Sequence, residues 1–134
     1  MLFDSALKPK LIYVFRINDE AHTGCLKIGE ATLPDGCNVF ELAPMSHILN
    51  KAAKDRINQY TRTAGITYEL LYTEVTLYFA AGRVRSFNDK AVHEVLLRSG
   101  IKRRESANWG NEWFETDLPT VINAIKAVKE GRKS

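Results

Sequence analysis

The sequence predicts an α+β fold in which helices flank a small antiparallel sheet of three strands. Three observations lead to this prediction: a segment rich in β-branched and aromatic residues opens the chain, segments of helical periodicity follow, and turn residues separate them. The chain has 134 residues, 45% of them apolar, which is enough for one hydrophobic core but not for two. We therefore expect a single domain over residues 1–134, with a core from about residue 11 to residue 130.

Three segments are expected to form the sheet. Residues 11–17 (LIYVFRI) follow Pro9 and stop at a polar pair, a pattern typical of a strand. Residues 25–28 form a second strand, so that the two make an antiparallel hairpin. Residues 68–79 are a long β-branched and aromatic run, which predicts the third strand. A short strand-like segment follows much later, at residues 112–115.

Three further segments carry apolar residues three or four apart and are expected to be helices. Each begins at a polar residue that can cap the first turn, namely Ser46, Ser86 and Asp117. Ser86 and Asp89 have the spacing of a capping box, and Pro119 suits the first turn of the last helix. The first two helices are expected to end near residue 60 and by Gly100.

Composition excludes several classes of protein. The net charge of +3 and the pI near 8.9 permit a nucleic-acid partner without requiring one. Two cysteines, Cys25 and Cys37, without a signal-peptide pattern indicate reduced thiols and a cytoplasmic location. No apolar run is long enough to span a membrane. His22, His47 and His93 are scattered, so a zinc site is not expected and any metal should be bound mainly by oxygen atoms.

Six short elements occur in an order that carries family information. They are LIYVF at 11–15, CLKIGEAT at 25–32, Arg56, TAGITYEL at 63–70, DKAVH at 89–93 and NEWFE at 111–115. From about residue 11 to 125 the chain resembles the GIY-YIG nuclease family, most closely the phage-type branch whose second motif reads Lys-Ile-Gly. The resemblance implies a DNA endonuclease that uses one metal ion, Mg²⁺ or Mn²⁺, and cuts a phosphodiester by attack of an activated water.

The resemblance also implies roles for three residues. Tyr13 matches the first-motif tyrosine that helps to activate the water. A free phenol has a pKa of about 10, so positive neighbours must lower that pKa for Tyr13 to act near neutral pH. Lys27 replaces the second-motif tyrosine and can lie next to Tyr13 on the neighbouring strand. Arg56 matches the family's catalytic arginine. The alternatives are a packed strand tyrosine, an exposed strand lysine and a solvated helix arginine.

The metal ligand is left open between two carboxylates. Asp89 stands where the family has a glutamate, but the capping-box spacing gives it an equally plausible structural role. Glu112 is the other candidate for the metal and for catalysis. His93 lies one helical turn after Asp89 and can bind metal or phosphate, or be a half-buried polar contact. The aromatic pair at 113–114 is expected to belong to the core rather than to stack on bases.

Basic residues gather around the end of the second predicted helix. They are Arg98, Lys102, Arg103 and Arg104, with Arg83 and Arg85 ahead of that helix. Such a cluster can bind a phosphate backbone with little sequence preference, although a run of charges is more often a solvated surface. Beside the nuclease pattern it predicts a track for DNA.

Three hypotheses follow for the function. The first is a magnesium-dependent DNA endonuclease domain, part of a DNA-processing or restriction and defence enzyme. The second is a catalytically weakened nucleic-acid-binding module on the same fold, in which the aspartate at position 89 has reduced cutting. The third is a protein-interaction domain with the same layout. The charged tail at 129–134 resembles a linker, so we expect a module, such as an N-terminal one, fused to or associated with a helicase or DNA-recognition part.

Overall fold

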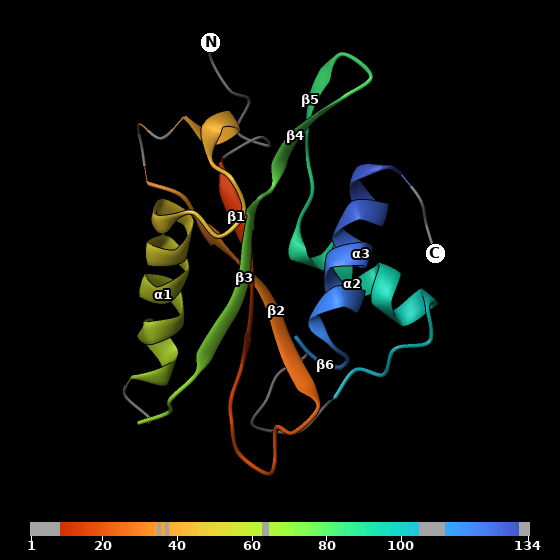
Figure 1. The fold of residues 1–134 in the computed structure, drawn as a ribbon. Coiled ribbons are helices and arrows are strands. Elements are labelled where there is room, and N and C mark those ends of the chain that lie inside the picture. The colour runs from red at the N-terminus through yellow and green to blue at the C-terminus, as the bar shows by residue number, and fades with distance from the viewer. Residues whose placement is uncertain (1–8, 35, 37, 63–64, 105–111, 132–134) are drawn as a thin grey trace.

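The computed structural model describes residues 9–34, 36, 38–62, 65–104 and 112–131. Its main sheet is antiparallel with the strand order β3-β1-β2-β6 (Figure 1). These strands are β1 Lys10–Arg16, β2 Cys25–Thr32, β3 Glu69–Val75 and β6 Trp113–Glu115. The helices are α1 His47–Thr61, α2 Asp89–Arg98 and α3 Leu118–Lys129, with a short 3-10 helix, η2, at Val39–Glu41. The α+β class is confirmed, but the sheet has four strands rather than three because β6 joins the edge of β2.

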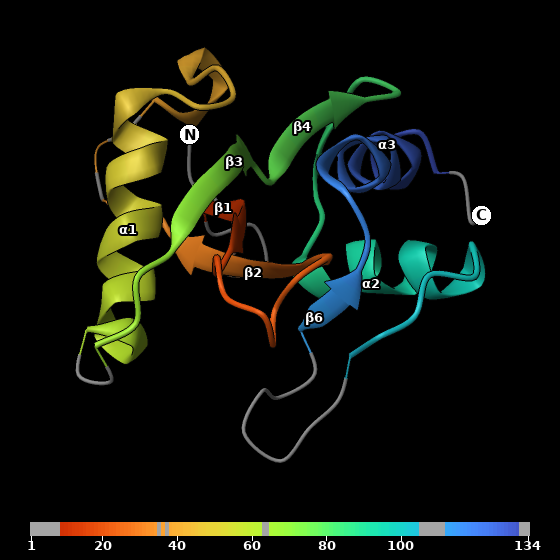
Figure 2. The same cartoon turned by 60° about the horizontal axis from the view of Figure 1, so that its bottom comes forward.

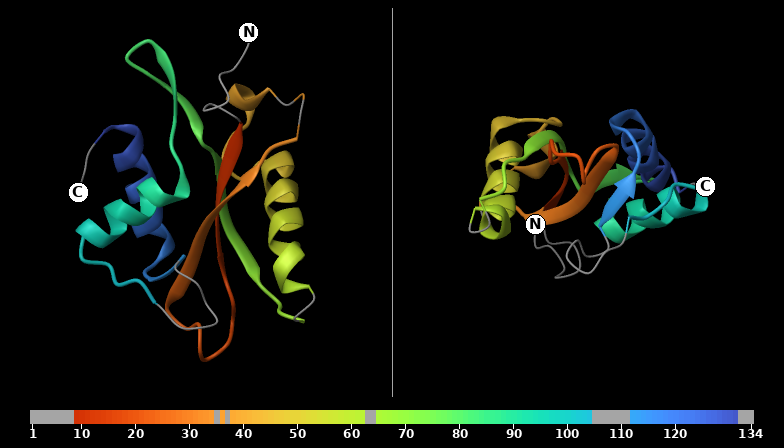
Figure 3. Two further views of the ribbon diagram at one scale, coloured as in Figure 1. Left: turned by 180° about the vertical axis from the view of Figure 1, so that it is seen from behind. Right: turned by 90° about the horizontal axis from the view of Figure 1, so that it is seen from below.

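The layers are helix, sheet, helices. Helix α1 covers one face of the sheet, and α2 and α3 cover the other (Figures 2 and 3). Among the described residues, none of the helices combines the length and the apolar character that crossing a bilayer requires. Cys25 is a buried free cysteine, whereas Cys37 and residues 132–134 lie outside the described residues.

The predicted hairpin of β1 and β2 is confirmed, with Tyr13 directly opposite Gly29 and Phe15 opposite Lys27. Strand β2 is longer than predicted and runs on to Thr32. Successive side chains of a strand point to opposite faces, so both faces of this central hairpin are covered by helices and both need apolar residues. This explains why the sequence of β1 is almost continuously apolar, and it assigns Tyr13 to the face that α1 covers.

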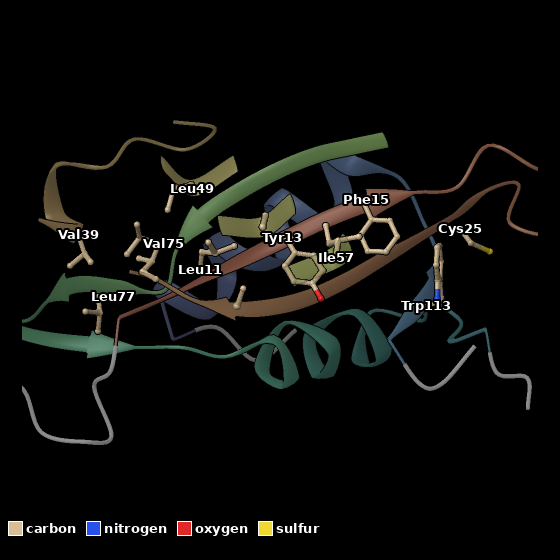
Figure 4. Packing of buried hydrophobic residues seen from close by; sticks show 13 residues of the cluster. Leu11, Tyr13, Phe15, Cys25, Val39, Leu49, Ile57, Val75, Leu77 and Trp113 are labelled. Carbon is tan, nitrogen blue, oxygen red and sulfur yellow. The ribbon is translucent and has the colours of Figure 1, made fainter. Parts of the chain in front are cut away.

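Two clusters of buried side chains hold the layers together. The cluster on the α1 face contains Leu11, Tyr13, Phe15, Leu49, Ala53 and Ile57, among others (Figure 4). The cluster on the opposite face contains Ile12, Val14, Ile28, Val92, Leu96, Phe114 and Ile125, among others. The aromatic pair at 113–114 is buried, so its predicted place in the core is confirmed. The sheet therefore divides the core of the domain into two layers, one on each of its faces.

The predicted third strand, 68–79, was wrong at its C-terminal end. Strand β3 stops at Val75, and a separate two-stranded ribbon follows, formed by β4 Leu77–Ala80 and β5 Arg83–Ser86. Thr76 makes the transition, because its amide donates to the carbonyl of Lys10 while its own carbonyl accepts from the amide of Phe87. The ribbon extends beyond the end of the main sheet (Figure 1). The composition of residues 68–79 is typical of a strand throughout, although the chain changes its pairing partner at Thr76.

The start of α2 also differs from the prediction. The caps predicted for the other two helices, Ser46 and Asp117, are confirmed. For α2, however, the side chain of Asn88 accepts the amide of Ala91 at 2.9 Å, whereas Ser86 is the last residue of β5. The capping box of Ser86 and Asp89 is therefore wrong. The carboxylate of Asp89 does not serve as the cap, and what it contacts instead defines the candidate site.

Candidate active site

The candidate site lies where β2 loses its neighbouring strand. Strand β6 pairs only with Cys25–Lys27, and the amide of Ile28 donates to the carbonyl of Glu112 at 3.1 Å. Beyond that point α2 takes the place of a strand, because Nε2 of His93 donates to the carbonyl of Ile28 at 2.8 Å. Side chains from the α1 face and from the α2 face can meet at this edge.

Tyr13 reaches the edge across a glycine. A Cβ atom on Gly29 would lie 2.6 Å from both the Cζ atom and the hydroxyl oxygen of Tyr13, so the ring lies directly on the Gly29 backbone. Figure 4 shows the Tyr13 hydroxyl pointing away from the leucine side chains of its cluster. Tyr13 is 2% exposed, so the ring has little room to move. The position needs a glycine for space, not for backbone conformation.

We expect Gly29→Ala to destabilise the fold by about 1–3 kcal/mol, because the new methyl group overpacks against a buried ring. Urea denaturation measures the effect. In a Tyr13→Leu background the aromatic obstacle is gone, and most of the destabilisation should disappear. An equal loss in both backgrounds would contradict the contact between Gly29 and Tyr13. Thr32→Ala, at the exposed end of the same strand, is the matched control.

Two cations border the same edge from the α1 side. Nζ of Lys27 lies 3.8 Å from Oε1 of Glu112 and 5.9 Å from the ring centroid of Phe15. Burial lowers the pKa of Lys27, the positive charge of Arg56 lowers it further, and Glu112 acts in the opposite direction. Arg56 is thus close enough to Lys27 for the two positive charges to repel each other. Its guanidinium also donates to the side chain of Gln59 at 3.1 Å.

An open pocket of about 470 Å³ adjoins Arg56, between α1 and the end of β2. Polar and charged side chains lining it are Lys10, Glu30, Thr32, Asp55, Arg56 and Gln59. The end of β2 is therefore open to solvent on the side that faces α1.

Asp89, which is 6% exposed, interacts with two other carboxyl groups, those of Glu112 and Glu30. The pKa of Glu112 is raised to about 7, first by burial, then by a hydrogen bond and charge repulsion with Asp89, while Lys27 and Arg56 act against the shift. The pKa of Glu30 is raised in the same way, by burial and then by Asp89. Like charges at short range favour the protonated form of a carboxyl, and a cation bound beside these groups would compete with that proton.

The donor atoms fit a hard divalent cation. One carboxylate oxygen of Glu30, Oε2, is buried and has no hydrogen-bond partner among the described residues, and Asp89 is not used as a cap. Within the described parts of the chain, no three His, Cys, Asp or Glu side chains converge closely enough to hold a metal by themselves. Mg²⁺ commonly binds one or two carboxylates and completes its shell with water and substrate, which this paired arrangement allows.

The sequence did not single out Glu30, although it follows Gly29 directly in the motif CLKIGEAT. Strand alternation offered a signal, since it directs Glu30 to the face opposite Tyr13, toward α2. What was missing was the position of Asp89, which depends on how α2 packs against β2. Glu30 is therefore a third candidate beside Asp89 and Glu112.

His93 is buried and serves the fold. Besides its bond to Ile28, its ring lies 4.9 Å from that of Phe114, and burial lowers its pKa. A neutral imidazole that donates through Nε2 matches the half-buried polar contact that the sequence left open. A role for His93 in metal or phosphate binding stays a prediction.

The basic residues predicted to bind DNA do not share one environment. Arg98 pairs with Glu94 at 4.0 Å, and Arg104 pairs with Glu115 at 3.3 Å. Lys102 is exposed, and so are Arg83 and Arg85 on strand β5. The guanidinium of Arg103 turns toward the buried ring of Phe114.

The structure thus brings most of the predicted site residues to one strand edge. Lys27, Arg56, Asp89 and Glu112 interact electrostatically, and Tyr13 lies on the glycine between Ile28 and Glu30. Comparison with models of protein families, with curated proteins and with solved structures gives no match for the chain.

Proposed function

We propose that the chain is a metal-dependent DNA endonuclease domain of the GIY-YIG type. The observation that carries the proposal is that acidic and basic side chains lie together at the open edge of β2. Carboxyl groups gather at Asp89, while the cations Lys27 and Arg56 act on the same Glu112 carboxyl. Hydrolysis of a phosphodiester needs both: oxygen ligands for a metal, and positive charge for the phosphorane oxygens.

Asp89, together with Glu112 or Glu30, would hold the metal ion. A bound Mg²⁺ or Mn²⁺ would supply Lewis-acid stabilisation of the phosphate and leaving oxygens. The shorter aspartate is accommodated here because two glutamate side chains approach it, one from β2 and one from the segment before β6. Two pairs of carboxylates are therefore candidates for the metal site: Asp89 with Glu112, and Asp89 with Glu30.

Tyr13 activates the attacking water in this proposal. As the water oxygen bonds to phosphorus, a water proton passes to the phenolate oxygen of Tyr13. The bond from phosphorus to the leaving oxygen breaks, and that oxygen takes a proton from solvent. Lys27 and Arg56 favour the phenolate before the attack and the extra negative charge on the phosphate oxygens during it.

The domain is small, and its candidate contacts with DNA are cations that bind phosphate rather than base edges. We therefore expect little sequence preference in cutting. We also propose that in the cell the domain works with a fused or associated helicase or DNA-recognition module, within a DNA-processing or restriction enzyme in the cytoplasm.

A cleavage assay tests the function. Supercoiled plasmid and branched DNA are incubated with the chain and Mg²⁺, Mn²⁺ or EDTA, and we expect nicked or linear products only with metal. Arg56→Ala should reduce the rate by about 10²–10³-fold, because it removes a charged group from the phosphorane. Arg62→Ala, an exposed arginine at the end of the same helix, is the control and should cut normally.

Other outcomes identify other functions. DNA binding with a steep salt dependence but no cutting with either metal would favour the binding module. Absence of both binding and cutting would favour a protein-interaction domain.

A further inference from the structure

Arg103 is held in place by backbone pairing at the outer edge of the sheet. It forms an isolated antiparallel bridge with Phe114. On either side of it, the amide of Arg104 donates to the carbonyl of Trp113 at 2.8 Å, and the amide of Glu115 donates to the carbonyl of Lys102 at 2.9 Å. Alternation along such a segment directs Arg103 and Arg104 to opposite faces. Arg103 is thus fixed in direction, unlike a side chain on a loose surface loop.

The two arginines meet different surroundings. Arg104 contacts the sulfur of Cys25 and pairs with Glu115. The guanidinium of Arg103 instead lies over the ring of Phe114, with its Cζ atom 5.4 Å from the ring centroid. Phe114 is fully buried, and its ring contacts that of His93. The positive charge of Arg103 also acts on His93 and lowers its pKa. Arg103 therefore borders the candidate site from the α2 side.

The charge of Arg103 lacks an anionic partner among the described residues. Its Nε atom is buried, and none of these described residues accepts a hydrogen bond from it. A buried donor without an acceptor destabilises the fold, and more strongly when the donor is charged. A stacked, partly desolvated guanidinium with an unused N–H group is what an anion-binding site presents before the anion arrives.

We propose that Arg103 binds a backbone phosphate of the nucleic acid, next to the phosphate that is cut. This inference rests on the proposed function and divides the cations between two phosphates. Nζ of Lys27 lies 3.8 Å from Glu112 on the side of the sheet that α1 covers, where Arg56 also lies, whereas Arg103 lies over Phe114 on the α2 side. Lys27 and Arg56 therefore serve the reacting phosphate, and Arg103 holds its neighbour in the same strand. The planar guanidinium suits two phosphate oxygens at once.

The Nε–H signal of Arg103 gives a direct test. Because Nε is buried, its proton should exchange slowly enough to be observed by NMR in ¹⁵N-labelled protein, and its absence from the spectrum of Arg103→Lys assigns it. We expect this signal to shift in a saturable way when a short single-stranded oligonucleotide is added in EDTA, with inorganic phosphate as a weaker probe. An unchanged Nε–H signal, while backbone amides elsewhere shift with the oligonucleotide, would overturn the inference.

Variants separate binding from packing. Arg103→Met keeps an unbranched side chain over Phe114 but removes the charge, so thermal stability should be retained. The slope of log K against log salt for duplex DNA should decrease by about 0.9, the value for one phosphate contact. KM should rise more than kcat falls, because the contact is present before the reaction begins. Arg103→Lys should restore the salt slope and only part of the affinity.

The control is Arg16→Met, which removes an arginine paired with Glu69 at the far end of β1. Its salt slope should equal that of the parent chain. Lower thermal stability of Arg103→Met with an unchanged salt slope would show a purely structural role and overturn the inference.

The two proposals fail in different ways. Cutting by the parent chain with no response of Arg103 overturns the inference and leaves the nuclease function intact. A shifted Nε–H signal without any cutting supports phosphate binding by Arg103 and counts against the nuclease function. Absence of DNA binding and of cutting overturns both.

Discussion

Removal of the Tyr13 hydroxyl in Tyr13→Phe is expected to reduce DNA cleavage by about 10³-fold, within the range that positioned proton acceptors contribute. The ring remains in place on Gly29, so the fold and the affinity for DNA should be retained. Only the acceptor for the water proton is lost. Single-turnover cleavage of a labelled duplex at saturating protein measures the chemical step without a contribution from binding.

Tyr68→Phe is the matched control for this prediction. The hydroxyl of Tyr68 donates to the side chain of Asn58 at 3.0 Å, on the same side of the sheet but outside the candidate site. Loss of that hydroxyl should leave the single-turnover rate within about two- to threefold of the parent rate, as expected for a residue away from the reacting groups. If Tyr13→Phe cuts at the parent rate, the water is activated by another group, and the role assigned to Tyr13 is wrong.

Glu112→Gln is expected to change stability and activity in opposite directions. At pH values above about 7 the carboxyl of Glu112 is charged beside Asp89, which the metal-free fold tolerates poorly. An amide removes that repulsion but also the contact with Lys27 at 3.8 Å. We expect a net gain near 1 kcal/mol after screening at this half-buried position, or about 2–4 °C in melting temperature. Metal-dependent cleavage should fall by about 10²-fold or more.

The pH dependence fixes the sign of this prediction. The pKa of Glu112 is about 7 in the folded chain against a usual 4.5, so the folded state holds a proton that the unfolded state releases first. This contribution to stability is complete below pH 4.5 and is lost as the pH rises toward 7. The advantage of Glu112→Gln in EDTA should therefore be absent at acidic pH and largest above pH 7.

Thermal melting across that pH range, with and without Mg²⁺, measures both effects. Mg²⁺ should stabilise the parent chain most above pH 7, where it no longer competes with the proton, and should stabilise Glu112→Gln far less. A lower melting temperature of the variant than of the parent above pH 7 in EDTA would mean that the bridge to Lys27 outweighs the repulsion from Asp89.

Local sequence patterns predicted the hairpin of β1 and β2 and some of the side chains that it positions. The hairpin alone brings Lys27 to the face that carries Tyr13, as predicted, whereas the position of Gly29 opposite Tyr13 was not predicted, because β2 runs on past residue 28. The N-caps at Ser46 and Asp117 were also predictable, because a cap involves neighbours in sequence. These features depend on contacts between nearby or directly paired residues.

The errors and omissions arise where a distant segment decides the outcome. Thr76 ends β3 because it bonds to Lys10 and Phe87, which composition does not reveal. Glu30 is part of the candidate site only because the packing of α2 places Asp89 beside it. Arg103 differs from its basic neighbours because its backbone forms a β-bridge with Phe114. In each case the residue types were visible in the sequence, but their partners depend on packing.

The two layers of the core also divide the residues of the proposed site. Tyr13 packs in the layer between the sheet and α1, the helix that carries Arg56, whereas Asp89 lies on α2, which packs in the layer on the other face. Regions of a protein can open independently when they share few contacts. A transient detachment of α1 would remove Arg56 from the site and leave the carboxylates in place. In the proposed nuclease, metal binding and the positive charge on the phosphate would then depend on different parts of the molecule.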